Sequence, residues 1–180
     1  MLIRPILPAE LPALRELAER TFREAWQHMN DPEPFEQYCR EKFTPEHIAA
    51  EMARPGSEFY FACIDDRPVA YLKLNIDCLP ESAEPMPVPG NAVQIERVYV
   101  LQNIQSQGLG AQLLQFSERR ACETGASWLW LSVWQKSPRS ILFYERHGFS
   151  IFGVETFWVG DDPQLDWLMF KAVDAPARSV

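Results

Sequence analysis

The segment from residue 98 to residue 114 constrains the fold of this chain most, because it joins a strand to a helix through a short loop with two glycines. Its sequence is VYVLQNIQSQGLGAQLL: a β-branched run, then QSQGLG, then leucines at helical spacing. A helix that begins here presents backbone N–H groups without intrahelical partners, and Gly108 and Gly110 let an anion approach the backbone. We therefore expect a strand at 92–100, a helix at 108–123 and an anion-binding loop between them.

The loop does not match the common nucleotide-binding glycine motifs. It lacks the Lys and the Ser or Thr of GxxxxGK[ST], and it does not spell GxGxxG. Two glycines at a helix start are more often structural than ligand-binding when taken alone. The rest of the chain must therefore decide what the loop does.

The remaining apolar patterns predict one mixed α/β domain around a single sheet. After a short N-terminal strand, apolar residues recur every three to four positions from Leu11 to Ala25, which indicates a helix. Two shorter helices follow, the second with Thr44 as its cap and Pro45 in its first turn. Further strands are expected at 58–64, 68–76, 128–133, 149–159 and 166–173, a helix at 138–147, and a proline-rich exposed loop at 77–92.

The charge balance argues against a nucleic-acid partner. The chain has 25 acidic and 17 basic residues and a net charge of −8, which repels a phosphate backbone. The same field would attract a cationic substrate, although an acidic balance is more commonly a matter of solubility. Net charge therefore argues against nucleic acid as a partner without choosing a substrate.

Neither a targeting peptide nor a membrane span is expected. The first residues lack the pattern of a signal peptide, and nowhere do about 18 apolar residues follow one another. The four cysteines have no CxxC spacing and the three histidines no HExxH pattern, so we expect reduced thiols and no metal site. We predict a cytoplasmic protein that is not integral to a membrane.

Two motifs resemble the signatures of the GNAT acetyltransferase superfamily. Residues 105–110, QSQGLG, match the [QR]xxGx[GA] pyrophosphate loop of that family, which follows a strand that holds pantetheine. Residues 137–149, SPRSILFYERHGF, are similar to its second signature, an N-x-x-A-x-x-F-Y helix ending in Gly-Phe, with Ser137 in place of asparagine and Ser140 in place of alanine. The resemblance covers nearly the whole chain.

The resemblance implies a GNAT fold, with one mostly antiparallel sheet of about seven strands flanked by helices. It implies one domain over 1–173, followed by a frayed tail at 174–180. It also implies acetyl-coenzyme A (acetyl-CoA) as co-substrate and an amine as acceptor. The residues that it assigns to the co-substrate are Val98, Tyr99, Val100, Gln105, Ser106, Gln107, Gly108, Leu109, Gly110, Ala111, Ser137 and Ser140.

Tyr144 falls on the family's tyrosine, near the end of the second signature helix. A phenol hydroxyl is a suitable donor to a departing thiolate, so Tyr144 is the candidate general acid for the coenzyme A sulfur. Without the family match, core packing would be the preferred interpretation of this tyrosine.

Glu96 is the candidate general base. Along the strand at 94–100, a period of two places it on one face with Val98 and Val100, and places Arg97 and Tyr99 on the other face. On this pattern no pairing between Glu96 and Arg97 is assumed. A surface or salt-bridged glutamate, in an enzyme that selects the neutral fraction of its amine, is the alternative.

Four further segments, TFREAW, IERVYV, WLSVWQKS and FWVGDDPQLDWLM, resemble the PaiA-type spermidine and spermine acetyltransferases. This resemblance implies a polyamine or a similar primary amine as acceptor. Two alternatives stay open: another amine, such as a protein N-terminus, a lysine or an antibiotic, or a non-catalytic acyl-CoA sensor, against which the retained Tyr144 argues. Members of the superfamily are often dimers, so a homodimer is also an open expectation.

Two further groups of side chains are candidate acceptor contacts. Asp161, Asp162 and Asp166 could attract a polycation, but we interpret them as a solvated turn and leave them out of the site. The tryptophans of the strand at 128–133 and Trp134 are interpreted first as core or cleft wall, although aromatic walls suit cationic ligands.

Overall fold

A computed structural model describes residues 1–81 and 87–173 and shows one seven-stranded sheet flanked by helices. The strands lie in the order β1-β2-β3-β4-β5-β7-β6, and within the described residues only β4 and β5 pair in parallel. The strands are β1 (Leu2–Pro5), β2 (Ser57–Ile64), β3 (Arg67–Asn75), β4 (Ala92–Val100), β5 (Trp128–Trp134), β6 (Ser150–Val159) and β7 (Asp162–Ala172). The expected mixed α/β fold with a mostly antiparallel seven-stranded sheet is confirmed.

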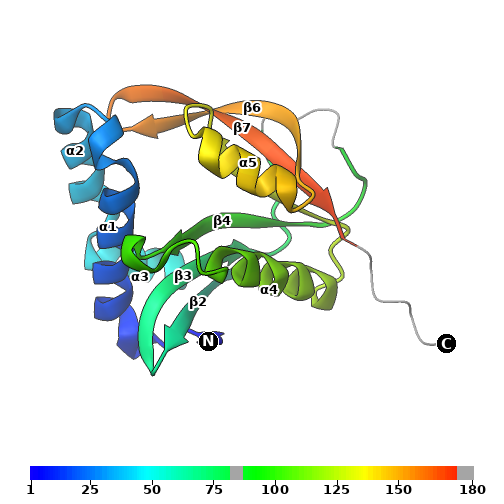
Figure 1. The fold of residues 1–180 in the computed structure, drawn as a ribbon, viewed down its shortest axis with the longest axis horizontal. Coiled ribbons are helices and arrows are strands. Elements are labelled where there is room, and N and C mark those ends of the chain that lie inside the picture. Colours follow the sequence, from blue (N-terminus) through cyan, green and yellow to red (C-terminus); the bar gives the residue numbers. More distant parts are fainter. Residues whose placement is uncertain (82–86, 174–180) are drawn as a thin grey trace.

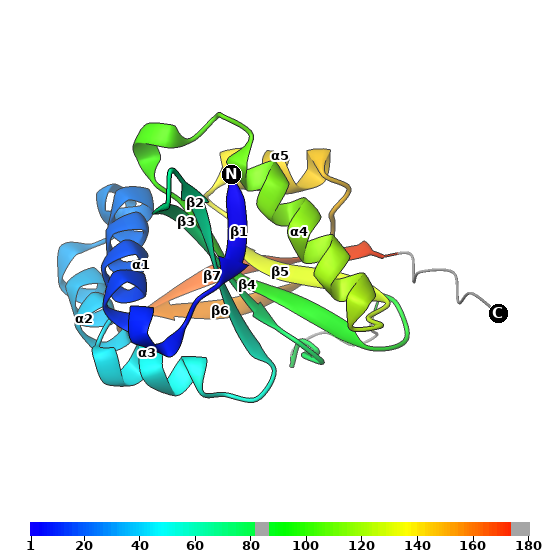
Figure 2. The same cartoon turned by 90° about the horizontal axis from the view of Figure 1, so that it is seen from below.

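The helices divide between the two faces of the sheet (Figure 2). They are α1 (Leu11–Trp26), α2 (Pro32–Lys42), α3 (Pro45–Met52), α4 (Leu109–Glu123) and α5 (Pro138–Arg146), with short 3-10 turns at Pro8–Glu10, Gln27–Met29 and Gln102–Ile104. On the first face, α1, α2 and α3 bury a core that includes Phe22, Phe35 and Tyr71. On the second face, α4 and α5 cover a core that includes Leu113 and Leu131. We call these the α1 face and the α4 face.

Local sequence signals explain most element boundaries. The Thr44 hydroxyl caps α3 by accepting a hydrogen bond of 3.1 Å from the His47 backbone N–H, as expected. Helix α2 begins at Pro32, three residues before the first apolar residue of its pattern, because proline fits the first turn of a helix. The described parts of the loop at 77–92 hold no helix or strand before β4. The expected tail at 174–180 lies outside the described residues.

A β-bulge in β4 overturns the expected alternation of side chains along this strand. Lys73 of β3 pairs with Arg97, but Leu74 pairs with Ile95, so Glu96 is an extra residue without a partner of its own in β3. An extra residue reverses the alternation beyond it. Val93 and Ile95 before the bulge therefore pack into the core of the α4 face, and so do Val98 and Val100 after it. The prediction that Glu96 shares a face with Val98 and Val100 is wrong.

The sheet opens between β4 and β5. Their parallel ladder covers only three pairs, from Ala92 with Trp128 to Gln94 with Trp130. Beyond these pairs the strands diverge, and Figure 1 shows β4 separating from β6, β7 and α5 toward the end where α1 lies. The β4 backbone from Ile95 to Val100 therefore has no ladder partner in β5. Among the described strands, the divergence leaves two facing unpaired strand edges inside the sheet, the last half of β4 and the last half of β5.

The hairpin of β6 and β7 is anchored to the start of α2. A side chain at Gly160 in its turn would meet the Pro34 carbonyl oxygen at 2.6 Å, so only glycine allows this approach. The Gln164 amide donates a hydrogen bond of 2.6 Å to the Asn30 side chain. These contacts hold the second half of the sheet against the α1 face across the diverging strands.

Candidate active site

The loop before α4 has the geometry of an anion site. Gly108 is the N-cap of α4 with a φ of 80°, which favours glycine, and no atom lies within 4 Å of the place where its Cβ would be. The first intrahelical hydrogen bond runs from the Gln112 N–H to the Gly108 carbonyl. The N–H groups of Leu109, Gly110 and Ala111 therefore lack intrahelical partners and are available to a ligand.

The residues before Gly108 hold the loop in place. The Gln105 amide donates to the Val100 carbonyl at 3.1 Å, which ties the loop to the end of β4. Ser106 has a φ of 66°, and its hydroxyl accepts a hydrogen bond of 3.2 Å from Arg139 of α5. Gln107 is exposed. Hydrogen bonds of Gln105 and Ser106 thus hold the expected cofactor loop in place.

Arg139 is a functional candidate that the sequence argument missed. Its exposed guanidinium reaches from the first turn of α5 to the glycine loop, where it adds positive charge beside the free N–H groups. The available signal was a basic residue directly after Pro138 in the second signature. Nothing in the sequence indicated that this residue crosses to the first signature.

The start of α5 packs closely against the start of α4. The Ser137 hydroxyl donates a hydrogen bond of 2.8 Å to the Ser140 hydroxyl, and Ser137 is buried. A Cβ at Gly110 would lie 3.2 Å from the Phe143 ring, so a small residue at 110 allows this contact. The two signatures predicted from sequence therefore meet in space on the α4 face.

Tyr144 is half-buried on α5, with its ring against Phe143 and Phe149. Burial raises the pKa of its hydroxyl above the usual value, and the nearby Tyr99 adds to this shift. The raised pKa keeps this hydroxyl protonated at neutral pH. Within the described residues no hydrogen bond involves it, so it can donate to a ligand. This state suits the predicted role of proton donor.

Side chains of the last three β4 residues divide between the two faces. Val98 and Val100 lie on the α4 face with Tyr144. Tyr99 lies on the α1 face, where its hydroxyl accepts a hydrogen bond of 3.0 Å from the Trp26 indole N–H. A ligand along this edge of β4 would therefore meet the valine side chains and the unpaired backbone on the α4 face, but not the tyrosine ring.

Glu96 is bound by a network of charged residues on the α1 face. Its carboxylate accepts hydrogen bonds of 2.7 Å from Lys73 and from Asn75, and it lies 3.3 Å from Arg97. The expectation that Arg97 points away from Glu96 is wrong, because the bulge turns both side chains toward α3. The role of Glu96 as general base stays a prediction. Its ion pairs match the alternative interpretation, a salt-bridged glutamate.

Glu51 of α3 is the centre of the same network. Arg97 binds it through two hydrogen bonds of 2.7 Å, and Lys73 lies 3.0 Å away. Burial opposes ionisation of Glu51, but the two cations outweigh burial and lower its pKa. The network fixes the bulged part of β4 against α3.

An aromatic group spans the divergence of the strands on the α1 face. Trp26 of α1 bonds to Tyr99 of β4, and its ring lies edge-on to Trp134 of β5, with centroids 5.9 Å apart. Trp128 and Trp130 are fully buried core residues. Of the tryptophans weighed from sequence, Trp134 is therefore the one that lies at the opening of the sheet.

Asp166 does not belong to a solvated turn, which corrects the sequence interpretation. It is 7% exposed and lies within β7, paired with Trp134 of β5 on one side and with Glu155 of β6 on the other. Asp161 and Asp162 do lie at the hairpin turn. Three acidic residues close together in sequence therefore occupy two different environments.

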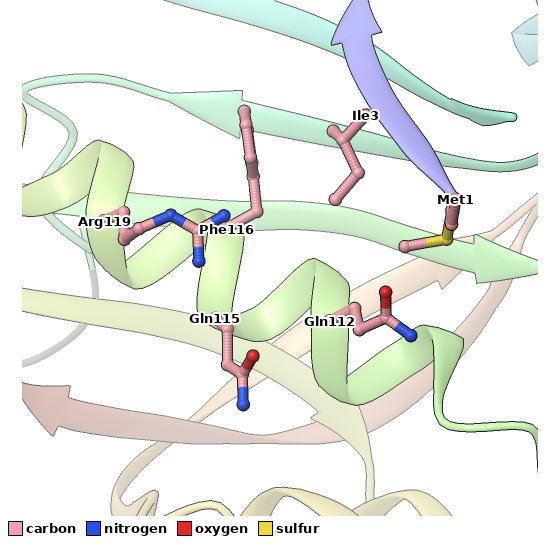
Figure 3. A pocket seen from close by; sticks show the side chains of 6 residues that line it. All are labelled: Met1, Ile3, Gln112, Gln115, Phe116 and Arg119. Carbon is pink, nitrogen blue, oxygen red and sulfur yellow. The ribbon is translucent and has the colours of Figure 1, made fainter.

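Two surface hollows lie away from these residues. The hollow in Figure 3 has a volume of about 340 Å³ and lies between β1 and the outer side of α4, lined by Met1, Ile3, Gln112, Gln115, Phe116 and Arg119. The second, of about 390 Å³, is lined by Met1, Leu2 and the turn between β2 and β3. Neither contains a predicted site residue or an acid and a base that face each other.

The described residues contain no group of three or more His, Cys, Asp or Glu side chains placed to hold a metal ion. Over the same residues, every helix is too short or too polar to cross a bilayer.

Comparisons with known proteins agree with this geometry. Residues 11–149 match the model of the acetyltransferase (GNAT) family. An uncharacterized N-acetyltransferase from the pepI 3′ region of Lactobacillus delbrueckii subsp. lactis is 34% identical over 164 residues, which cover 91% of this chain and 92% of the relative. The chain belongs to the GNAT family and is an N-acetyltransferase.

Solved structures of distant relatives share the fold. PaiA N-acetyltransferase from Thermoplasma acidophilum, in complex with coenzyme A, superposes with a TM-score of 0.73 at 20% identity, over 95% of this chain and 98% of that one. The ribosomal-protein-S18-alanine N-acetyltransferase of Escherichia coli gives 0.69 at 16% identity, over 99% and 97% of the two chains. Only the second name states an acceptor, and both identities are low, so the likeness supports the fold and does not choose an acceptor.

Proposed function

We propose that this protein transfers the acetyl group of acetyl-CoA to a primary amine of a small molecule, with polyamines as the favoured acceptors. The observation that carries the proposal is the meeting of two elements on the α4 face: the free N–H groups after Gly108 and the unengaged hydroxyl of Tyr144. The unpaired edge of β4 passes between the two halves of the sheet beside them.

Each element has a chemical task in this proposal. The N–H groups of residues 109–111, with Arg139, would hold the pyrophosphate, because a helix N-terminus and a guanidinium both favour anions. Backbone groups between Val98 and Val100 would hold the pantetheine arm and polarise the thioester carbonyl. Acetyl-CoA supplies an activated thioester when it is bound. Tyr144 would give its proton to the departing sulfur.

The favoured acceptor class rests on charge. Glu155 and Asp166 lie side by side on the α1 face next to Trp134, and the chain as a whole carries a net charge of −8. Carboxylates and aromatic rings both favour a cationic ligand. A protein N-terminus is the second candidate, because its α-amino group presents the same charge to the same face. The cytoplasmic location and a homodimer also remain proposals.

The test is acetyl-CoA turnover, followed as release of free thiol, with spermidine, spermine, small monoamines and a panel of peptides with free N-termini. We expect turnover with the polyamines and slower turnover with monoamines. Turnover of peptides alone would move the acceptor to a protein N-terminus. Tight binding of acetyl-CoA in calorimetry without turnover of any amine would support the sensor alternative and contradict the proposal.

A further inference from the structure

We propose that Asp166, together with Glu155, forms the site that receives the ammonium group of the acceptor, and that Asp166 takes the proton that the amine must lose before it attacks. This inference deepens the proposed function and rests on it. It moves the general base from the bulge of β4 to the middle of β7, on the other side of the diverging strands.

The Asp166 side chain is largely buried and, among the described residues, has no charged or hydrogen-bonding partner. Asp166 is 7% exposed, and in the residues that the structure describes its carboxylate takes part in no hydrogen bond and no ion pair, while its oxygens keep some contact with solvent and can be reached by a ligand. Buried carboxylates in folded proteins are normally paired or hydrogen-bonded, because an isolated one loses its hydration without compensation. The Asp166 carboxylate can therefore accept hydrogen bonds from a ligand.

A residue of like charge lies directly opposite Asp166 in the neighbouring strand. Glu155 of β6 is the cross-strand partner of Asp166, so their Cβ atoms are about 5 Å apart on one face of the sheet. Two carboxylates at this spacing repel each other, and no described Lys or Arg pairs with either of them. An ammonium between them would supply the absent positive charge and hydrogen-bond donors to both.

The two carboxylates lie close to the opening of the sheet, where we predict that acetyl transfer takes place. Asp166 is the partner of Trp134, whose ring meets Trp26, and Trp26 bonds to Tyr99 across the opening between β5 and β4. The Tyr99 hydroxyl is within electrostatic range of Asp166 on one side and of Tyr144 on the other. The pair therefore lies at the opening of the sheet, with Tyr144 across it on the opposite face.

The titration of the pair suits this task. Burial raises the pKa of Asp166 to about 7, and the neighbouring Glu155 adds to the shift. Burial also raises the pKa of Glu155. A hydrogen bond from Ser132 opposes this shift, and the charge of Glu81, in the loop before β4, adds to it. Other charged or titratable groups near this region include Tyr99 on β4, Tyr38 of α2, whose ring packs on Phe157 of β6, and Lys136, whose ammonium lies 5.6 Å from the Trp134 ring centre. A base that titrates near neutral pH both accepts and releases protons efficiently.

The acceptor enters the proposed step as the ammonium ion R–NH₃⁺. One proton passes to Asp166, and the neutral nitrogen forms a bond to the thioester carbonyl carbon. The C–S bond breaks, and the sulfur takes the proton of Tyr144. The second proton that leaves the nitrogen restores the Tyr144 hydroxyl through solvent, and Asp166 releases its proton to solvent. The products are the acetylated amine, free thiol and one proton.

The first experiment compares Asp166→Asn with Asp161→Asn, the same change at an exposed aspartate in the turn of the same hairpin, over pH 5.5–9.5 with spermidine. We expect Asp166→Asn to lower kcat/KM for spermidine by about 100-fold at pH 7 and to remove the acidic limb of the pH profile near pH 7. Affinity for acetyl-CoA should stay unchanged. Asp161→Asn should match the wild type within about twofold.

Glu155→Gln separates the two carboxylates. Loss of the like charge lowers the pKa of Asp166, so we expect the acidic limb to move to lower pH while KM for spermidine rises. A structural role alone would not move this limb. Retention of wild-type kcat/KM and pH profile in Asp166→Asn would overturn the inference.

A direct titration keeps the inference testable whatever the acceptor panel shows. Carbonyl ¹³C NMR of the aspartates, assigned with Asp166→Asn, should show Asp166 titrating near pH 7 and its pKa falling when spermidine or methylamine is added. If amines are acetylated but leave this pKa unchanged, the inference fails and the proposed function stands. If amines lower this pKa but are never acetylated, the proposed function fails and the ammonium site stands.

Discussion

The two faces of the sheet recognise ligands by different means. On the α4 face, the candidate cofactor site consists of backbone N–H groups, a glycine with φ of 80° and an exposed arginine, all within two continuous segments. On the α1 face, the candidate acceptor site consists of side chains from α1, β4, β5, β6 and β7. Backbone geometry suits a ligand that never changes, whereas side chains can be exchanged one at a time. We infer that acetyl-CoA recognition is fixed by the loop and acceptor choice by the side chains.

The largest expected effect concerns Tyr144, the α4-face residue that is proposed to act where the two ligands react. Tyr144→Phe removes only the hydroxyl, so kcat should fall about 100-fold because the departing sulfur loses its proton donor. Affinity for acetyl-CoA should remain within about twofold of the wild type, since the ring contacts with Phe143 and Phe149 persist. Steady-state kinetics and calorimetry measure the two quantities. Unchanged kcat would remove Tyr144 from the mechanism.

A smaller effect tests whether the α4 face acts through its backbone. Gly108→Val forces a β-branched residue into a left-handed conformation and should weaken acetyl-CoA binding about tenfold. Gly125→Val is the matched control, because Gly125 lies at the other end of α4 with a φ of 75° and has equally open surroundings. Both variants should lose about 1–2 kcal/mol of stability. Equal loss of affinity in both variants would show that the loop has no special role in binding.

The smallest expected effect is a gain of stability on the α1 face. Because the pKa of Asp166 is about 7 in the folded protein and near 4 in the unfolded chain, the folded state binds more protons between these values. Stability contributed by Asp166 is therefore full below pH 4 and lost as pH rises to 7. Asp166→Asn should raise the free energy of unfolding by about 1 kcal/mol at pH 8, and by nothing at pH 4.

Urea unfolding at the two pH values measures this difference, with Asp161→Asn as the control. A lower stability of Asp166→Asn at pH 8 would mean that the carboxylate has stabilising contacts in the folded state. In that case the α1 face would already satisfy the Asp166 carboxylate without a ligand, and the proposed difference between the two faces would not hold.

The α4 face was largely predictable from sequence, and the α1 face was not. The loop at 105–110 and the helix after Pro138 carry their chemistry in local motifs, and their element boundaries follow from glycine and proline. Arg139 was missed because its partner Ser106 lies 33 positions away. Asp166 was misinterpreted because its neighbours Glu155 and Trp134 become neighbours only through the β5-β7-β6 strand order, which no local pattern encodes.

The alternation error in β4 has a different physical cause. The sequence AVQIERVYV has the composition of a regular strand, and a bulge adds one residue without any glycine or proline to mark it. The contacts that fix the bulge come from Lys73 and Glu51, which lie on β3 and α3. Periodicity within one strand could not reveal a shift that tertiary partners impose.

In engineering terms, the bulge makes β4 two short strands of opposite phase joined at Glu96. A chimera with another member of the family can exchange either half of β4 only if the side chains on both sides of Glu96 keep the faces that they have here. If the same residues formed a regular strand without the bulge, Val98 and Val100 would turn toward α1 and Tyr99 toward α5, which would exchange the surroundings of the two ligands; removal of Glu96 itself would keep their faces. The bulge thus sets which side chains of β4 each ligand meets.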